Sequence, residues 1–269
     1  MNFELDGQSA YAYTGGKPFD PALPGVVFVH GALHDHSVWG LQSRYLAHHG
    51  RAVLAVDLPG HGRSGGTALD VPAAGRWLVS LIEASGLSRT ALVGHSMGSL
   101  IALEAAALLG ARAGAVVMIG TAYPMKVSPK LLELCQRDVL AAIDLVNALS
   151  NSTHAAKPSN PGPGFSTHGI NRALMRRMHA AYTQGHLFHA DFAACDAYAG
   201  LESATPKLKA PVSLVLGARD QMTLPKAAAP IIEALKPSVT TLPVGHNLMS
   251  EDPDGVLNAI QAALKQEAR

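Results

Sequence analysis

Short apolar runs that end in turn residues constrain the fold of this chain more than any other feature. Strands that are apolar on both faces are typical of a parallel sheet that helices cover on each side. The pattern therefore predicts an α/β fold with a mostly parallel central sheet flanked by helices. The five clearest runs are Val26 to His30, Ala52 to Asp57, Thr90 to Gly94, Ala115 to Ile119 and Val212 to Leu216.

Helical spacing separates these runs, and the clearest helix start is at Asp252 and Pro253. Asp can cap the free amides at the beginning of a helix, and Pro lacks only an amide that would be unpaired there. The longest nearly apolar stretch, Leu100 to Gly110, is interrupted by Glu104. It is too short to span a bilayer, so we expect a buried helix and no membrane span.

The alternation of strands and helices is interrupted after Gly120. Nearly ninety residues pass before the next strand-like run begins at Val212, and they contain helical spacing instead. We expect residues 121–206 to be a helical lid inserted between the two parts of one core domain, residues 1–120 and 207–269. An insertion at the carboxyl edge of the sheet lies where ligands bind in open α/β folds, so it would control substrate access.

Within this insertion, Ser128 and Pro129 open a helical stretch that continues to Leu149. A second helix is expected around Met175, after a Pro- and Gly-rich stretch from Lys157 to Gly164. The alternative is that the insertion only adds packing to the core.

The composition argues against several classes of partner and location. The chain has 21 Lys and Arg against 20 Asp and Glu, so there is no basic surplus to neutralise nucleic-acid phosphates. With 48% hydrophobic and 15% charged residues, it can bury enough surface to fold. Cys135 and Cys195 are too few for a disulfide framework, and Met1 to Asp6 lacks the features of a secretory signal. We therefore expect a cytoplasmic protein.

A GxSxG pattern is present at Gly94, His95, Ser96, Met97 and Gly98. It follows an apolar run and opens a helical stretch, which is the strand, turn and helix of a nucleophile elbow. The glycines leave room for a strained turn that exposes Ser96, and the next helix directs its first amides toward a developing oxyanion. An ordinary glycine-rich turn is the alternative interpretation.

A serine nucleophile needs a base to take its proton, and the base needs a carboxylate to orient it. Asp220 follows the run that ends at Leu216, and His246 follows the last apolar run, Val239 to Leu242. Both are therefore expected at the same edge of the sheet as Ser96. Taken singly, Asp220 could instead cap a following helix and His246 could be a surface histidine.

The tetrahedral oxyanion formed by such a serine needs two backbone amides. One comes from the residue after the nucleophile, here Met97, and one from the loop after an early strand. That strand ends at His30 and Gly31, so the Ala32 amide is the best second candidate, with Leu33 behind it.

Taken together, these motifs resemble the α/β-hydrolase superfamily, in the branch with an HG turn before the first helix. The resemblance covers His30 to Gly31, Asp57 to Ser64, Gly94 to Gly98, Gly217 to Asp220, and Gly245 to His246. It implies an α/β-hydrolase fold, carboxylesterase-like activity through Ser96, His246 and Asp220, and no organic cofactor. It also implies that Asp57, in the DxxGxGxS loop, is structural.

Other chemistries fit the residues less well. Relatives that open epoxides or cleave carbon–halogen bonds use aspartate at the nucleophile position, where this chain has Ser96. The cluster His30, His34, Asp35 and His36 lacks the spacing of an HxHxDH metal site, so we expect no bound metal. Hydrolases of carbon–carbon bonds often have Asn before the serine, whereas this chain has His95.

We therefore expect a serine hydrolase that cleaves small carboxylic esters or lactones with an apolar part, through an acyl-enzyme. The candidate substrate-binding residues are Leu33, His34, Tyr123, Tyr198 and Leu248, and Phe188 and Phe192 are further aromatic candidates in the insertion. One alternative is a carbon–carbon hydrolase or enol-lactonase of aromatic degradation, with Arg172, Arg176 or Arg177 binding a carboxylate. The other is a ligand-binding protein on the same fold without turnover.

Overall fold

In this computed structural model, residues 1–152 and 165–267 are described, and their strands form one eight-stranded sheet. Its order is β1-β2-β4-β3-β5-β6-β7-β8. All neighbours from β4 to β8 pair in parallel, which confirms the predicted mostly parallel sheet. The strands are β1 (Asn2–Leu5), β2 (Gln8–Tyr13), β3 (Gly25–Val29), β4 (Ala52–Asp57), β5 (Thr90–His95), β6 (Ala113–Ile119), β7 (Val212–Gly217) and β8 (Ser238–Leu242).

The apolar runs correspond to the strands from β3 to β8, whereas the hairpin of β1 and β2 was not predicted. This hairpin turns at Asp6 and Gly7, which both have positive φ, and β2 pairs antiparallel with β4. Its strands mix exposed and buried positions, so they lack the continuous apolar run that marks the central strands.

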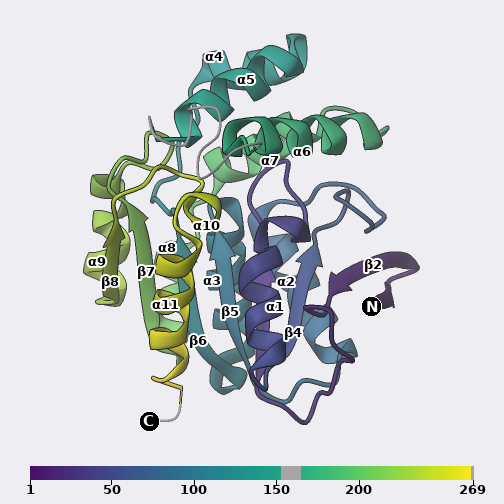
Figure 1. The fold of residues 1–269 in the computed structure, drawn as a ribbon, viewed down its shortest axis with the longest axis vertical. Coiled ribbons are helices and arrows are strands. Elements are labelled where there is room, and N and C mark those ends of the chain that lie inside the picture. Colours follow the sequence, from purple (N-terminus) through teal and green to yellow (C-terminus); the bar gives the residue numbers. More distant parts are fainter. Residues whose placement is uncertain (153–164, 268–269) are drawn as a thin grey trace.

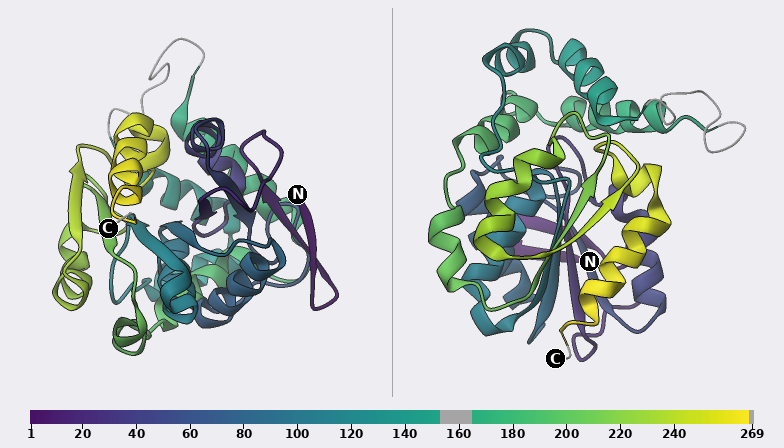
Figure 2. Two further views of the ribbon diagram at one scale, coloured as in Figure 1. Left: turned by 90° about the horizontal axis from the view of Figure 1, so that it is seen from below. Right: turned by 90° about the vertical axis from the view of Figure 1, so that its left-hand side faces the viewer.

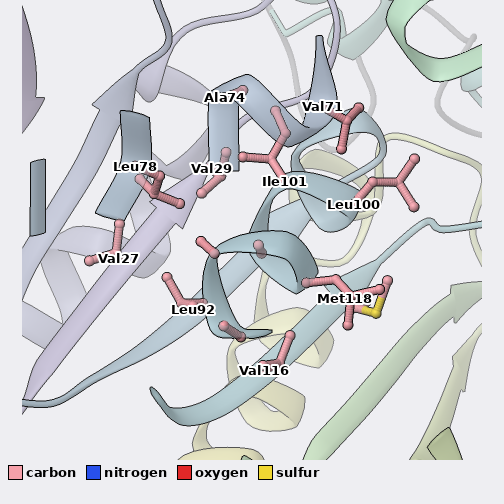
Figure 3. Close-up of a cluster of buried hydrophobic side chains, with 14 of the residues drawn as sticks. Val27, Val29, Val71, Ala74, Leu78, Leu92, Leu100, Ile101, Val116 and Met118 are labelled. Carbon is pink, nitrogen blue, oxygen red and sulfur yellow. The ribbon is translucent and has the colours of Figure 1, made fainter. Parts of the chain in front are cut away.

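Two helical layers cover the sheet, as Figure 2 shows. Successive residues of a strand point to opposite faces, and β3 illustrates this. Val27 and Val29 pack with α2 (Val71–Ala84) and α3 (Met97–Leu109), in the cluster drawn in Figure 3. Val26 and Phe28 pack on the other face, with α1 (Gly40–His48) and α11 (Pro253–Leu264).

The predicted helix start at Asp252 is present, because its Oδ1 accepts a hydrogen bond of 2.9 Å from the Gly255 amide. No helix in the described ranges is both long and apolar enough to cross a membrane. The remaining short helices of the core are α8 (Leu201–Ala204), α9 (Ala229–Leu235) and α10 (Leu248–Glu251), with 3₁₀ turns η1 (His36–Trp39), η2 (Gly110–Arg112), η3 (Thr205–Lys207) and η4 (Pro225–Ala228).

Four helices between β6 and β7 lie above the carboxyl edge of the sheet (Figure 1). We call them the cap: α4 (Pro129–Arg137), α5 (Val139–Ser150), α6 (Thr167–Ala181) and α7 (Leu187–Ala197).

The helical stretch expected from Ser128 to Leu149 is divided at Asp138, which ends α4 and caps α5 by accepting from the Ala141 amide at 3.0 Å. Lys157 to Gly164 lies outside the described residues. After the cap, residues 198–207 return to the core and pack against α3.

Candidate active site

Ser96 lies at a sharp turn between β5 and α3, with φ 52° and ψ −122°. A non-glycine residue at positive φ is strained by about 1–3 kcal/mol, which persists only where the surroundings enforce it. Crowding enforces it here. A Cβ on Gly94 would lie 2.1 Å from the Gly98 carbonyl oxygen, and one on Gly98 would lie 2.3 Å from that of Val29. Only glycine therefore fits at the two outer positions of the GxSxG pattern.

Asp220 and His246, from the loops after β7 and β8, are hydrogen-bonded to each other. The Nδ1–H of His246 donates to Oδ2 of Asp220 at 2.8 Å. The Asp220 carboxylate is buried and also accepts from the amides of Met222 and Thr223, both at 2.8 Å. Burial alone would raise the pKa of Asp220, but His246 and the Thr223 hydrogen bonds lower that pKa below its usual value. An ionised carboxylate thus holds His246 by Nδ1, and no residue in the described ranges bonds to Nε2.

The backbone of His246 is held from two sides. Its amide donates to the Ser150 carbonyl at the end of α5, at 2.7 Å. Its carbonyl accepts from Nε2 of His95, at 2.9 Å, and the two imidazole rings are 4.7 Å apart. Burial is the main cause, and the neighbouring His246 a smaller one, of a His95 pKa well below its usual value. This ring therefore stays neutral. The sequence pattern gave no role to His95, which is the variable position before Ser96.

Ser96 and His246 line the same pocket, together with Gly31 and Ala32. A Cβ on Gly31 would lie 3.1 Å from the Cβ of Ser96, so the HG turn passes directly beside the serine. Among the described residues, the structure has no acceptor for the amides of Ala32 and Met97. Three strand ends and the first turn of α3 therefore meet at one place.

Leu33 and His34, the next residues of the HG turn, have different positions. Leu33 is fully buried outside the pocket lining, and its amide donates to Oδ2 of Asp191 on α7, at 2.8 Å. His34 lines the pocket, and its Nε2 is 2.8 Å from Oδ1 of Asn171 on α6.

A chain of side-chain amides fixes the tautomer of His34. The His168 carbonyl can only accept, and Asn147 Nδ2 donates to it at 2.8 Å. Asn147 Oδ1 accepts from Asn171 Nδ2 at 2.9 Å, which leaves Asn171 Oδ1 to accept from His34 Nε2–H. Burial lowers the pKa of His34, so its Nδ1 is an unprotonated acceptor, and it has no partner among the described residues.

Tyr123, Tyr198 and Leu248 do not line the pocket, in contrast to the expectation. The chain returns to α3 at Tyr198, whose hydroxyl donates to Glu104 at 2.7 Å, and Tyr123 donates to Glu202. Leu248 is buried on the face of the sheet that α1 and α11 cover.

The apolar wall comes from other residues, namely Val146, Met175, Phe188, Phe192 and Met222. Of these, only Phe188 and Phe192 were candidates. Met222 could have been found from its position two residues after Asp220, and Asn171 and Met175 from their spacing of four on one helix face.

The histidine and carboxylate cluster near the HG turn is bonded within the protein. His36 donates to Asp57 at 2.7 Å, and Arg177 donates to Asp35 at 2.8 Å. The described residues contain no group of His, Cys, Asp and Glu arranged to hold a metal ion. Arg172 is paired with Asp144, and none of the cap arginines lines the pocket.

Comparison with known proteins agrees with this architecture. A model of the alpha/beta hydrolase family matches residues 26–259. The acetyltransferase component of an acetoin cleaving system from Pseudomonas putida is 32% identical over 122 residues, 45% of this chain and 29% of that protein. The chain thus spans less than a third of the length of this relative.

Two solved structures superpose over nearly the whole chain. One, described as an N-acyl homoserine lactone degrading enzyme, has a TM-score of 0.81 at 18% identity and covers 97% of this chain and 99% of its own. The other, an enol-lactonase from Burkholderia xenovorans, has a TM-score of 0.80 at 18% identity, with 98% and 100% covered. At 18% identity, these two structures show that the fold is shared and do not show a shared function. The family match over most of the sequence goes further, and the chain belongs to the alpha/beta hydrolase family.

Proposed function

We propose that this protein is a serine hydrolase of small carboxylic esters or lactones, with Ser96 as nucleophile, His246 as base and Asp220 as the carboxylate that orients the base. One observation carries the proposal. A serine in a strained turn shares a pocket with a histidine whose Nδ1 is bonded, at 2.8 Å, to a buried carboxylate. This arrangement leaves the other ring nitrogen free to take a proton beside the serine.

The reaction proceeds through an acyl-enzyme. His246 Nε2 takes the hydroxyl proton of Ser96 while Oγ bonds to the substrate carbonyl carbon, and the amides of Ala32 and Met97 hold the oxyanion. The alcohol leaves with the proton of His246 when the carbon–oxygen bond breaks. His246 then takes a proton from water, which attacks the acyl group, and Ser96 recovers its proton as the acid departs. No cofactor enters these steps.

The substrate class follows from the pocket lining. Val146, Met175, Phe188, Phe192 and Met222 offer an apolar wall for an acyl or alcohol part. The structural neighbour described as an N-acyl homoserine lactone degrading enzyme also supports ester or lactone chemistry. For an enol-lactonase or a carbon–carbon hydrolase acting on a dienol acid, a cation would be needed near the carboxylate. Arg172 and Arg177 are engaged by Asp144 and Asp35, and Arg176, like them, does not line the pocket, which disfavours this second candidate.

The cap is proposed to act as the lid of this pocket, because α5, α6 and α7 supply most of its apolar lining. A cytoplasmic location is proposed as well, since Cys135 and Cys195 are both free and buried.

The proposal is tested with p-nitrophenyl esters and a fluorophosphonate. Wild-type protein should hydrolyse short esters and become covalently labelled, and Ser96→Ala should lose at least about 10³-fold in kcat/KM and all labelling, with unchanged thermal unfolding. Activity that survives in Ser96→Ala would end the proposal. Binding of esters without turnover or labelling would instead favour a ligand-binding protein, and a preference for ring-fission dienoates would favour the carbon–carbon hydrolase.

A further inference from the structure

A buried carboxylate of the cap reaches two loops of the core. Asp191 lies on α7 and is 1% exposed, and its Oδ2 accepts from the Leu33 amide at 2.8 Å and from His61 Nε2 at 2.9 Å. The partners are far apart in the sequence, because His61 belongs to the DxxGxGxS loop and Leu33 to the HG turn. Figure 1 shows α7 above the edge of the sheet, so this carboxylate connects the cap to the core.

The pair of Asp191 and His61 is an ion pair. The Nδ1 of His61 is 3.1 Å from the Pro59 carbonyl oxygen, which can only accept, and Nε2 faces the carboxylate. Both ring nitrogens therefore donate, which requires the imidazolium. Burial alone would lower the pKa of His61, but the Asp191 carboxylate raises it above its usual value. The positive ring in turn compensates the buried negative charge of Asp191.

The backbone around Ala32 is fixed on both sides by buried side chains. The Gly31 carbonyl accepts from His30 Nδ1 at 2.8 Å, and that carbonyl belongs to the same peptide unit as the Ala32 amide. The next peptide unit carries the Leu33 amide, which Asp191 holds. Leu33 has φ 53°, a strained conformation for a residue with a side chain, so the loop needs such an anchor to keep it.

We propose that Asp191 is a positioning residue of the oxyanion hole, through which α7 of the cap holds the Ala32 amide in its catalytic orientation. The inference rests on the proposed serine-hydrolase function. The cap would then act on the catalytic geometry as well as on access to the pocket. Without the contact from α7, the peptide unit that carries the Leu33 amide is no longer held. Asparagine cannot fully replace Asp191, because its oxygen can accept from the Leu33 amide but carries no negative charge to balance the His61 imidazolium, so the buried ion pair that fixes this side chain is lost.

The test compares Asp191→Asn with Asp196→Asn. Asp196 is a second carboxylate on α7 and also accepts from a loop amide, but that amide belongs to Val127, at 3.0 Å, and not to the HG turn. For Asp191→Asn we expect kcat on a short p-nitrophenyl ester to fall about 10- to 100-fold with KM changed less than about threefold, because a displaced donor weakens the transition state alone. Asp196→Asn should keep kcat, although its thermal unfolding temperature can fall as much.

The inhibition constant of a trifluoromethyl ketone distinguishes a role in positioning the oxyanion hole from a role in stability alone. It adds to the serine as a hemiketal with an oxyanion, so its inhibition constant in Asp191→Asn should rise by the same factor as kcat/KM falls. If Asp191→Asn does not fold, the amide of Leu33 can be replaced by an ester through incorporation of the α-hydroxy acid of leucine. That change keeps every side chain, replaces the donor to Asp191 by an ester oxygen and should lower kcat in the same way.

The outcomes separate this inference from the proposed function. Wild-type protein that shows neither esterase activity nor fluorophosphonate labelling removes the function and the inference with it. Active wild-type protein with kcat and inhibition constant unchanged in Asp191→Asn, or with only KM raised, overturns the inference and leaves the function standing.

Discussion

His95 donates its Nε2 hydrogen to the backbone carbonyl of His246 at 2.9 Å, so the residue before the proposed nucleophile holds the loop of the proposed base. This contact joins the end of β5 to the loop after β8, and both histidines line the pocket. The Ser150 carbonyl completes the arrangement from the cap, by accepting from the amide of His246. The backbone of His246 is therefore held at its amide by the cap and at its carbonyl by His95.

Replacing His95 is expected to affect the rate through His246. In His95→Phe the His246 carbonyl loses a buried donor, which costs about 1–3 kcal/mol and lets the loop shift, so we expect kcat to fall about tenfold or more. His95→Gln keeps an N–H donor and should retain most of the rate. Steady-state kinetics on a short ester, with circular dichroism to verify folding, measures both. Equal rates for wild-type protein and His95→Phe would refute this role.

Asp220→Asn should reduce the rate without unfolding the protein. The Asn oxygen can still accept from the Met222 and Thr223 amides, which both bind Oδ1 of Asp220, but the Asn NH2 group would face His246 Nδ1 and favour the tautomer whose Nε2 carries the proton. We expect kcat to fall about 10³- to 10⁴-fold, with KM little changed. Stopped-flow release of p-nitrophenol measures the acylation step. A loss below about tenfold would contradict the role of Asp220.

The sequence predicted the central strands and the loops that meet at the pocket because both depend on local patterns. An apolar run marks a strand buried on both faces, and the motif residues come directly after the ends of β3, β5, β7 and β8. The β1–β2 hairpin could not be predicted in the same way. Its residues, such as Gln8 and Ser9, are exposed on an edge of the sheet.

Much of the pocket wall could not be predicted, because it depends on how the cap folds back over the sheet. Tyr198 is an aromatic residue of the kind that often lines a pocket, yet it caps the end of α7, where the chain returns to α3. Conversely, Asp191 and His61 are 130 positions apart, and neither has a local pattern that predicts their contact. Such pairs follow from helix packing, which single-sequence periodicity does not describe.

Acid should destabilise the protein through its buried neutral histidines. Burial lowers the pKa of His30 to about 4, and the pKa of His34 and His95 is lowered too. Unfolded histidines take up protons near pH 6.5, so below that pH the unfolded state binds more protons than the folded state. The free energy of unfolding should therefore fall, for His30 by about 1 kcal/mol per pH unit between about 6.5 and 4.

His61 acts in the opposite direction, because its pKa is raised. Its stabilising contribution is fully present below about pH 6.5 and is lost as the pH rises through the folded-state pKa. Urea unfolding at pH 7, 6 and 5 measures the net slope. His34→Gln should make the slope shallower, whereas His186→Gln, at an exposed position, should not. Identical slopes in wild-type protein and His34→Gln would show that His34 is not buried in its neutral form.

Phe192→Ala should shift substrate preference toward longer acyl chains. The ring of Phe192 lines the pocket and packs against that of Phe188, with 4.5 Å between centroids, so its removal opens space beside Ser96. We expect the ratio of kcat/KM for the octanoyl over the acetyl p-nitrophenyl ester to rise about tenfold, at a loss of about 3 kcal/mol in stability. Phe165→Ala, at an exposed position outside the pocket lining, is the matched control and should change neither quantity. A ratio that stays constant in Phe192→Ala would place the acyl chain against another wall of the pocket.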